Sequence, residues 1–375
     1  MTRSRDVANI IKQPFTTTLG TSNYRAGVNA GNSIASGGNY NVCVGDEAGT
    51  AISTGDNNTL IGYVAGDAIS TSSANTAVGS FAMTSMTGGA DNVALGTSAL
   101  DIDTNGSKTV AVGRNALGAQ NFTTATESNN VAVGYEAGKA VTTGRSNTLL
   151  GKSAGLALTD ADFNVAVGTD ALATDTLGSQ STAVGVGALY SQNFTTATDT
   201  YNTAVGRSAG LSVTTGTFNT LVGGLSGDAI TDGINNTGIG YASLGALTQG
   251  TRNTAIGYTS LDSDTLGSKS TAIGYSALGV QNFTTATDSF NVAVGHEAGA
   301  AVTTAEQNTL IGALAGDALN TGALNVALGY NSLGADTKGN RSTALGRNTL
   351  AAQNFTTSTS AYNVAAGFAA GASVT

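Results

Sequence analysis

The residues of this chain that could carry out chemistry are few and widely separated. The 375 residues include one histidine, His296, and one cysteine, Cys43, which cannot supply the several ligands that a zinc site needs or a Cys–His catalytic pair within one stretch of sequence. Glu47, Glu136 and Glu297 occupy one position of a sequence repeat but in distant copies, so the opposed carboxylates of a glycosidase are not evident. We therefore expect no enzymatic activity and no catalytic, metal-binding or cofactor-binding residues.

His296 and Cys43 have simple structural explanations. His296 stands at a variable position of the repeat, where other copies have Tyr, Arg, Lys or Ser, so we expect an exposed side chain. Cys43 stands where most copies have Ala, which indicates a small buried side chain, and a single cysteine excludes an intrachain disulfide. The many glycines lack the strand–loop–helix context of a phosphate-binding loop.

One acidic position does recur, each time in the motif Asp-Thr-x-Gly. Its four copies are Asp103, Asp175, Asp264 and Asp336. A turn in which the carboxylate accepts a hydrogen bond from the backbone nearby explains this motif best. Calcium binding by Asp101 with Asp103, and by Asp262 with Asp264, is the alternative, although the other two copies lack the second aspartate.

The composition excludes several classes of partner. The net charge is −9, and the fifteen Lys and Arg residues form no run along the chain, so neither nucleic-acid binding nor docking on an anionic membrane is expected. No run of 18 apolar residues exists, so we expect no membrane insertion. The N-terminal apolar stretch VANII is too short for the hydrophobic region of a signal peptide, and none is evident.

A repeat organises the rest of the chain. The motif Asn-x-Ala-x-Gly returns every 17 residues, with four steps of 21 residues that each contain the sequence Gln-Asn-Phe. The pattern of steps from Gly45 to Gly206 repeats from Gly206 to Gly367, so a 161-residue block occurs twice. The repeat glycines are at 45, 62, 79, 96, 113, 134, 151, 168, 185, 206, 223, 240, 257, 274, 295, 312, 329, 346 and 367. A strict period of this kind is typical of a repeat architecture.

Each repeat predicts a short β-strand that ends at its glycine. The residue before the glycine is Val, Ile or Leu in every copy except Ala366, and the residue three before it is Thr or Val; this alternation of β-branched residues favours a strand. A second, less clear strand is expected around EAGKAV or SALGV. Seventeen residues are too few for a βαβ unit and fit one coil of a parallel β-solenoid. About 19 coils at roughly 4.8 Å give a roll of about 90 Å.

An asparagine stands four residues before the glycine in most copies. Stacked coils would place these side chains above one another, where their amides could hydrogen-bond as a ladder; alternatively, Asn only favours the turn before the strand. Both explanations are structural. The residues are Asn41, Asn58, Asn75, Asn92, Asn130, Asn147, Asn164, Asn202, Asn219, Asn236, Asn253, Asn291, Asn308, Asn325 and Asn363.

The two faces of the predicted strand differ. One carries Thr or Val with Val, Ile or Leu, and the other carries Asn, Ala and Gly. We expect the Asn and Ala face to be buried against partner chains, with a homotrimer as the simplest closed arrangement, so that Ala204 and Ala272 would lie between chains. The alternative is a monomeric, three-sided β-helix whose Thr rows face water.

The 21-residue steps each add four residues around Gln-Asn-Phe-Thr-Thr. An insertion into a solenoid forms a loop on one edge, so Phe122, Phe194, Phe283 and Phe355 are expected to bulge from the same edge. Each Phe either folds back over a neighbouring coil or chain and locks the assembly, or contacts a partner such as another fibre or a glycan. The first explanation is preferred because no charged group clusters around the bland Thr-Thr-Ala-Thr flank.

The units NTAIGYSAL, NVAVGYEAG and NTLIGALAG resemble the head repeats of YadA-like trimeric adhesins. The resemblance covers residues 41–375 and implies a left-handed parallel β-roll with three chains around one axis. The opening TRSRDVAN resembles the start of structural and tail-fibre proteins of tailed phages, marine phages especially. It implies an attachment segment at 1–22, a degenerate capping coil at 23–40 and a rod at 41–375. Within the first segment, SRDVANIIKQ favours either a short helix that stops before Pro14 or an unstructured end.

These resemblances predict a non-enzymatic structural subunit without cofactors, similar to a phage tail fibre and located in a virion or an extracellular fibre. Its expected partners are copies of itself, other virion or fibre proteins through the N-terminus, and a host-surface glycan or receptor. One alternative is a carbohydrate-binding adhesin that uses the Gln-Asn-Phe loops. A remote alternative is an ice-binding solenoid, which would need Thr-x-Thr in every coil, whereas that motif occurs only in the expansions, as at Thr124 and Thr126.

Overall fold

The computed structural model describes residues 20–375, and this part of the chain is an all-β parallel solenoid of about 20 turns, which confirms the predicted parallel β-solenoid. It contains no helix, and so none that could cross a membrane. Residues 1–19, with the helix expected before Pro14 and nearly all of the attachment segment, lie outside the described residues. The chain divides into two compact units, one ending at Asp160 and one comprising Ala161–Thr375.

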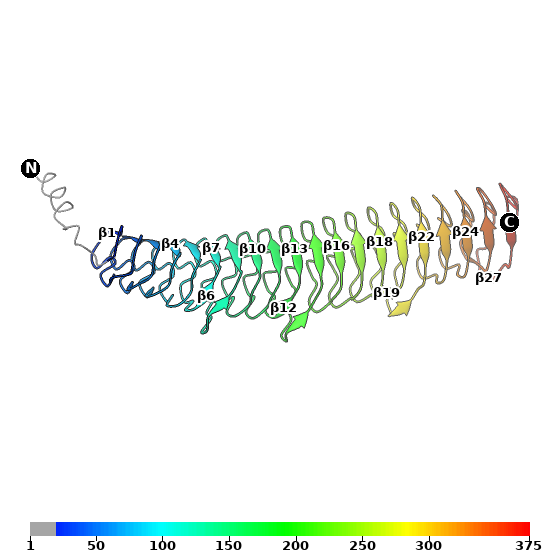
Figure 1. The fold of residues 1–375 in the computed structure, drawn as a ribbon. Coiled ribbons are helices and arrows are strands. Elements are labelled where there is room, and N and C mark those ends of the chain that lie inside the picture. The colour runs from blue at the N-terminus through cyan, green and yellow to red at the C-terminus, as the bar shows by residue number, and fades with distance from the viewer. Residues whose placement is uncertain (1–19) are drawn as a thin grey trace, which may run out of the picture. The chain divides into compact units, whose positions relative to one another are not determined.

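Each coil contributes one three-residue strand to a parallel sheet (Figure 1). In unit 1 these strands are β1 (Tyr24–Ala26), β2 (Val42–Val44), β3 (Thr59–Ile61), β4 (Thr76–Val78), β5 (Val93–Leu95), β7 (Val110–Val112), β9 (Val131–Val133) and β10 (Thr148–Leu150). In unit 2 they are β11 (Val165–Val167), β13 (Thr182–Val184), β15 (Thr203–Val205), β16 (Thr220–Val222), β17 (Thr237–Ile239), β18 (Thr254–Ile256), β20 (Thr271–Ile273), β22 (Val292–Val294), β23 (Thr309–Ile311), β24 (Val326–Leu328), β26 (Thr343–Leu345) and β28 (Val364–Ala366).

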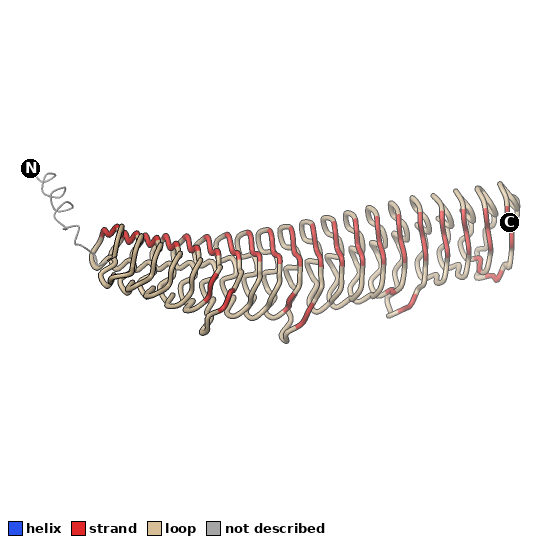
Figure 2. Tube along the Cα trace, viewed as in Figure 1, coloured by secondary structure: helices blue, strands red, loops and turns tan. Residues whose placement is uncertain are grey.

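The four expansions add a second kind of strand pair. Two-residue strands before and within each expansion pair in parallel and stand out from the coils (Figure 2). The pairs are β6 (Gly106–Ser107) with β8 (Thr126–Glu127), β12 (Gly178–Ser179) with β14 (Thr198–Asp199), β19 (Gly267–Ser268) with β21 (Thr287–Asp288), and β25 (Gly339–Asn340) with β27 (Thr359–Ser360). The inserted residues therefore form ordered β-structure without altering the sheet on either side.

The repeat sets the register of the sheet within each unit. Thr254 pairs with Thr271 and Ile256 with Ile273, so identical repeat positions lie side by side. The first described coil follows the same rule, because β1 pairs with β2 over its full length. Residues 23–40, expected to form a degenerate cap, thus carry the same strand as the later coils.

The expected burial of the strand faces is wrong. Ala204 and Ala272 have no exposed surface within the single chain, so they belong to the interior of their own coil and do not lie between chains. The Thr, Val and Ile positions on the opposite face are part-exposed. The reason is that the segment after the repeat glycine crosses back over the Ala side and covers it with its own buried Ala and Leu, such as Ala277 and Leu278.

The second predicted strand is also absent from the described coils. The segment after each glycine is a series of turns, in which residues such as Thr259 (φ 47°) and Leu261 (φ 50°) take left-handed backbone angles. Alternating left-handed residues bend the chain sharply and cannot form an extended strand. These left-handed residues therefore reverse the direction of the chain within a few residues.

The repeat glycine is required by backbone geometry. Gly257 has φ of +138°, and a Cβ atom at this position would lie 2.3 Å from the carbonyl oxygen of Gly274 in the next coil. The coils stack so closely here that no side chain fits. The same geometry recurs along the sheet, as at Gly240 and Gly223.

We predict that Gly257→Ala lowers the free energy of unfolding by about 3 kcal/mol, because the substitution combines a strained backbone angle with a clash against a neighbouring coil. Urea denaturation followed by circular dichroism measures the effect. Gly224→Ala is the matched control, since its Cβ would meet Tyr241 at an ordinary 3.6 Å. Equal stabilities of the two variants would contradict this account of the repeat glycine.

Candidate functional site

The repeated asparagines form a hydrogen-bonded column inside the coils. Asn236 illustrates the pattern: its backbone N–H donates to Oδ1 of Asn219 at 3.0 Å, and its own Oδ1 accepts the N–H of Asn253 at 3.0 Å. Its Nδ2 donates to the carbonyl oxygen of Gly250 at 2.9 Å. The buried side-chain amide of Asn236 therefore both accepts and donates a hydrogen bond, as expected for a buried polar group.

Most links in this column join a side chain to the backbone. Direct amide–amide bonds, which a simple ladder would have, occur from Asn58 to Asn41 and from Asn92 to Asn75 at 3.1 Å, and from Asn219 to Asn202 at 3.4 Å. Asn23, which lies outside the regular repeat, opens the column by accepting the N–H of Asn41 at 2.8 Å. The asparagines thus connect consecutive coils and also close each coil on itself.

The column changes at four coils where Asn is replaced by Thr109, Ser181, Ser270 or Ser342. There the glutamine of the following expansion takes over. Gln281 donates from Nε2 to Asp264 Oδ2 at 2.6 Å and to Ser270 Oγ at 3.0 Å, and its Oε1 accepts Nδ2 of Asn291 at 2.8 Å. Sequence reasoning missed this role, although the four repeats without Asn are the four that precede Gln-Asn-Phe.

The recurring aspartate anchors the expansion. Oδ1 of Asp264 accepts the N–H of Gly267 at 3.0 Å, which closes the expected turn, and also the N–H of Phe283 at 3.1 Å in the next coil. Burial raises the pKa of Asp264, while the hydrogen bonds from Gln281 and Phe283 lower it. Asp103, Asp175 and Asp336 make the equivalent bonds.

These hydrogen bonds bear on the calcium alternative. Both carboxylate oxygens of Asp264, and both of Asp103, face N–H donors. Within residues 20–375, no group of three or more His, Cys, Asp or Glu side chains is arranged to hold a metal ion. The Asp-Thr-x-Gly motif is explained by the N–H donors that its carboxylate accepts.

The phenylalanines do not bulge as expected. Phe122, Phe194 and Phe283 are 5–7% exposed, and Phe355 is part-buried. The loop itself protrudes, but what it exposes is polar or small, as at Thr284 and Ala286. A Cβ at Gly339 would lie 2.9 Å from the ring of Phe355, so the ring packs on the glycine of the Asp-Thr-x-Gly turn. Each ring folds back onto its own chain.

The remaining candidates for chemistry stay apart. His296 is exposed, stacks on Tyr275 with ring centroids 5.0 Å apart, and lies 3.7 Å from Glu297. Cys43 is fully buried, and burial raises the pKa of its thiol to about 11, which makes it unreactive at neutral pH. Glu47 and Glu136 lie in different coils of unit 1. No reactive constellation arises from these residues.

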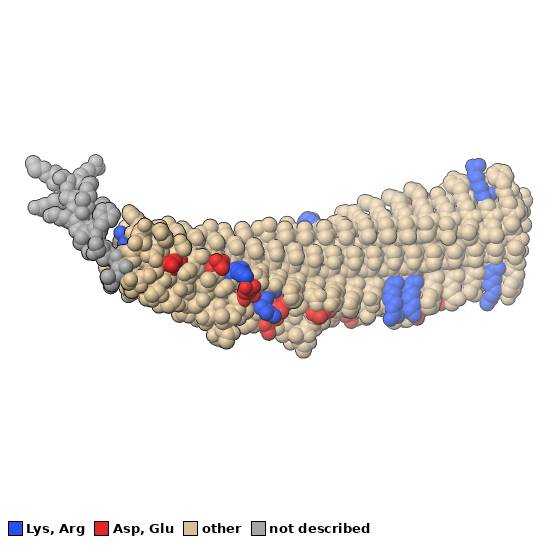
Figure 3. Space-filling view, in the orientation of Figure 1, with Lys and Arg blue, Asp and Glu red and all other residues tan. Residues whose placement is uncertain are grey.

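The outer face of the sheet in unit 2 is a distinctive surface. We define it as four positions in each coil, two on the strand and one on either side of it, as in Arg252, Thr254, Ile256 and Tyr258. Because side chains alternate along a strand, these four positions point away from the buried Asn and Ala. Figure 3 shows the band over these strands free of charged side chains, with Lys and Arg on its borders.

Aromatic and basic residues concentrate on this face. Of the six Lys and Arg residues in unit 2 it carries Arg207, Arg252, Lys269, Arg341 and Arg347, and it carries none of the unit's thirteen Asp and Glu residues. Its aromatic residues are Phe163, Tyr201, Phe218, Tyr241, Tyr258, Tyr275, Phe290, Tyr330, Tyr362 and Phe368. These basic residues are spread over many coils and lie at the two borders of the face. They are far apart in sequence, but they share two repeat positions.

The aromatic residues of the outer face stack from coil to coil. Ring centroids are 5.4 Å apart for Tyr241 and Tyr258 and 5.6 Å apart for Tyr258 and Tyr275. Arg347 lies over the rings of Tyr330 and Phe368, at 5.5 and 5.8 Å. These contacts hold exposed side chains in regular positions and give the border of the face a fixed shape.

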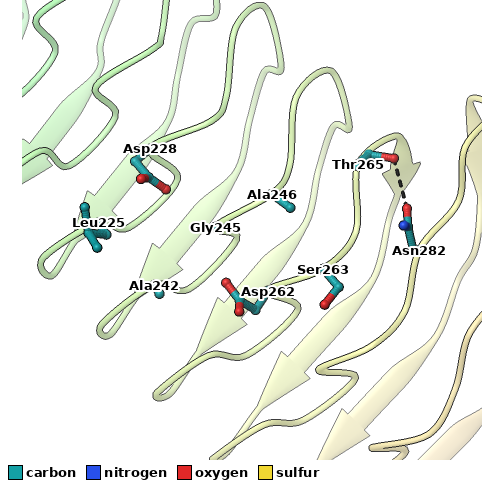
Figure 4. A pocket seen from close by; sticks show the side chains of 9 residues that line it. All are labelled: Leu225, Asp228, Ala242, Gly245, Ala246, Asp262, Ser263, Thr265 and Asn282. Atoms are coloured by element: carbon teal, nitrogen blue, oxygen red, sulfur yellow. Dashed lines mark hydrogen bonds between the residues drawn. The ribbon is translucent and has the colours of Figure 1, made fainter.

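Carboxylates gather on the turns that follow the strands. Asp228 and Asp262 lie two coils apart on either side of Gly245, which has no side chain, and together line a shallow groove (Figure 4). Burial raises the pKa of each of these carboxyls, and the neighbouring charge of Asp262 adds to the effect at Asp228. Burial also raises the pKa of Asp317, with a further contribution from Glu297.

We predict that Asn236→Ala lowers the free energy of unfolding by about 3 kcal/mol, because it leaves the buried N–H of Asn253 and the carbonyl of Gly250 without partners. Thr237→Val is the control, since Val occupies this strand position in other coils, as at Val292. Chemical denaturation of both variants tests the prediction. A stable Asn236→Ala protein would show that the column contributes little.

We also predict that Phe283→Ala lowers the free energy of unfolding by about 3 kcal/mol, as expected for removal of a buried aromatic ring. Thr284→Ala, on the exposed part of the same loop, should leave stability unchanged. Thermal melting of the two variants distinguishes two roles of Phe283. Either its ring stabilises the packing of the coils, or it contributes only to contacts with a partner. In the second case both variants would melt as the original protein does.

Comparison with protein families and with curated proteins found no family model that matches this chain and no similar curated protein.

Proposed function

We propose that this protein is a non-enzymatic structural subunit that associates with copies of itself, as a homotrimer, to form a rod similar to a phage tail fibre. The observation that carries the proposal is the outer face of unit 2. One strand position holds Thr or Val, and the other holds Val, Ile or Leu in every strand of unit 2 except at Ala366; both rows are in register and at least part-exposed. An exposed row of Val, Ile and Leu of this length on a single chain is typical of a surface that another protein covers.

The size of the face fits a stable interface. Twelve strands at roughly 4.8 Å and seven residues at roughly 3.3 Å give an area of about 55 by 20 Å, or about 1,100 Å². A standard protein interface buries about 800 Å² on each partner. Enrichment in Tyr, Phe and Arg with depletion of Asp and Glu is also the composition found at interfaces.

The interior supports a scaffold role. The Asn column and the Asp–Gln clusters use their buried polar groups in bonds that join consecutive coils or close a coil on itself. Such a chain gains stiffness from its repeats and offers long surfaces, the usual purpose of a solenoid. A virion or extracellular fibre, with the N-terminus attached to other fibre proteins, is the setting that the sequence resemblances favour.

Two other functions remain as alternatives. A carbohydrate-binding adhesin would use the exposed parts of the expansions, such as Thr284, Thr285 and Ala286, and its glycan would be a host-surface ligand. An ice-binding solenoid would use the Thr rows of the sheet, for example Thr254 and Thr271. In both cases the outer face would remain uncovered in solution, which separates them from a self-associating rod.

We predict that the purified protein is a trimer and that Ile256→Gln with Ile273→Gln weakens it at least tenfold, because both side chains lie on the outer face. Sedimentation equilibrium measures the association, and small-angle scattering checks for an elongated particle. The control pair, Ala197→Gln with Ala286→Gln, changes exposed loop residues and should leave the trimer intact. A folded monomer at all concentrations would contradict the proposal.

A further inference from the structure

We propose that the outer face of unit 2 in one copy packs against a row of carboxylates in unit 2 of a second copy. This inference rests on the proposed self-association and names the two surfaces that meet. The carboxylate row consists of the residues two and five positions after the repeat glycine, and its acidic members are Asp170, Asp228, Asp262, Glu297 and Asp317.

The two surfaces are complementary in charge. The outer face carries five Lys or Arg residues and no Asp or Glu, whereas the positions of the carboxylate row carry five acidic residues and no Lys or Arg within residues 161–375. A chain with a net charge of −9 has thus separated its charges by repeat position. Opposite fields of this kind select and orient a partner.

Little within the chain neutralises these charges. Lys269 pairs with Asp288 of the neighbouring expansion, but no ion pair is found for Arg207 or Arg252 among the described residues. On the other surface, the carboxylates of Asp228, Asp262 and Asp317 interact with backbone N–H groups, and none of the three forms an ion pair with Lys or Arg among residues 20–375.

The shape of the carboxylate row also suits a cationic side chain. Asp228, Gly245 and Asp262 line one shallow groove (Figure 4), in which Oδ1 of Asp262 lies over Gly245, only 2.3 Å from where a Cβ of Gly245 would be, and Gly279 lines a second groove with Asp262 and Glu297. Each groove is lined by two carboxylates. An Arg or Lys that enters it meets acceptors on both sides, the arrangement in which charge-assisted hydrogen bonds are strong.

Charge also decides the symmetry of the assembly. Two outer faces packed against each other would oppose cations with cations, which disfavours a two-fold dimer through this surface. An outer face packed on the carboxylate row of the next copy is a head-to-tail contact between different surfaces, and such a contact forms a ring, such as a trimer, when the rotation between copies closes. The pairing therefore accounts for a cyclic assembly by a physical cause.

Charge reversal on each surface, alone and combined, tests the pairing. Arg207→Glu with Arg252→Glu, and separately Asp228→Lys with Asp262→Lys, should each weaken association at least tenfold in sedimentation equilibrium. The variant that combines all four substitutions should recover most of the lost affinity, because it restores opposite charges across the contact. Asp199→Lys with Asp232→Lys, at exposed positions outside both surfaces, is the matched control and should associate normally. Circular dichroism confirms that each variant is folded.

The outcomes separate this inference from the proposed function. An original protein that never associates contradicts both. A trimer that neither reversal weakens, or a combined variant as weak as the separate ones, overturns the pairing and leaves the self-associating rod intact. A monomer that heparin–agarose retains, and that Arg207→Glu with Arg252→Glu releases, would show that the face binds an anionic polymer instead of a second copy.

Discussion

The stacking of one short coil directly on the next is the constraint on which this structure depends. A 17-residue coil buries its polar groups at the same place in every turn, so a single unsatisfied group would be multiplied along the chain. The side chain of Asn solves this problem because it is both a donor and an acceptor. In Asn236 the acceptor reaches the next coil and the donor closes the coil itself. The same close stacking requires glycine at positions such as Gly257.

The expansions show how the chain can insert four residues without breaking this column. In the coil that carries each expansion, the usual Asn is replaced by Ser or Thr. The side-chain amide of Gln281, or of its equivalent in the other expansions, makes the hydrogen bonds at this place instead. Asp264 then fixes the backbone of the following Phe, whose ring packs back on the chain. The replacement of Asn and the presence of Gln, Asp and Phe therefore belong together, because these residues jointly hold the expansion against the neighbouring coils.

The interior hydrogen bonds recur from coil to coil. The coils therefore differ from one another mainly in their surface side chains. In unit 2 the outward strand positions hold uncharged residues, mostly Thr, Val, Ile and Leu, the flanking positions hold most of the aromatic and basic residues, and five carboxylates lie on the turns. The sign of the charge depends on the position within the repeat: the outer face carries basic residues and the carboxylate row carries acidic residues. A surface organised in this way suits a partner that is itself periodic, which is the physical reason to favour a second copy over a small ligand.

The sequence by itself determined the period, the strand before each glycine, the parallel stacking and the structural role of Asn, since these follow from local pattern and from the identity of repeated residues. It also located the Asp and Phe positions, but not the Gln that joins them, because Gln281, Asp264 and Ser270 meet only across coils. Tertiary structure alone decided which face of the strand is inside. Alternation shows that two faces exist, but the left-handed turns at Ser276 and Leu278 carry the chain back over Ala272 and leave Ile273 outside. The gathering of basic residues on that outer face follows from the same turn, because only stacking brings side chains many residues apart onto one surface.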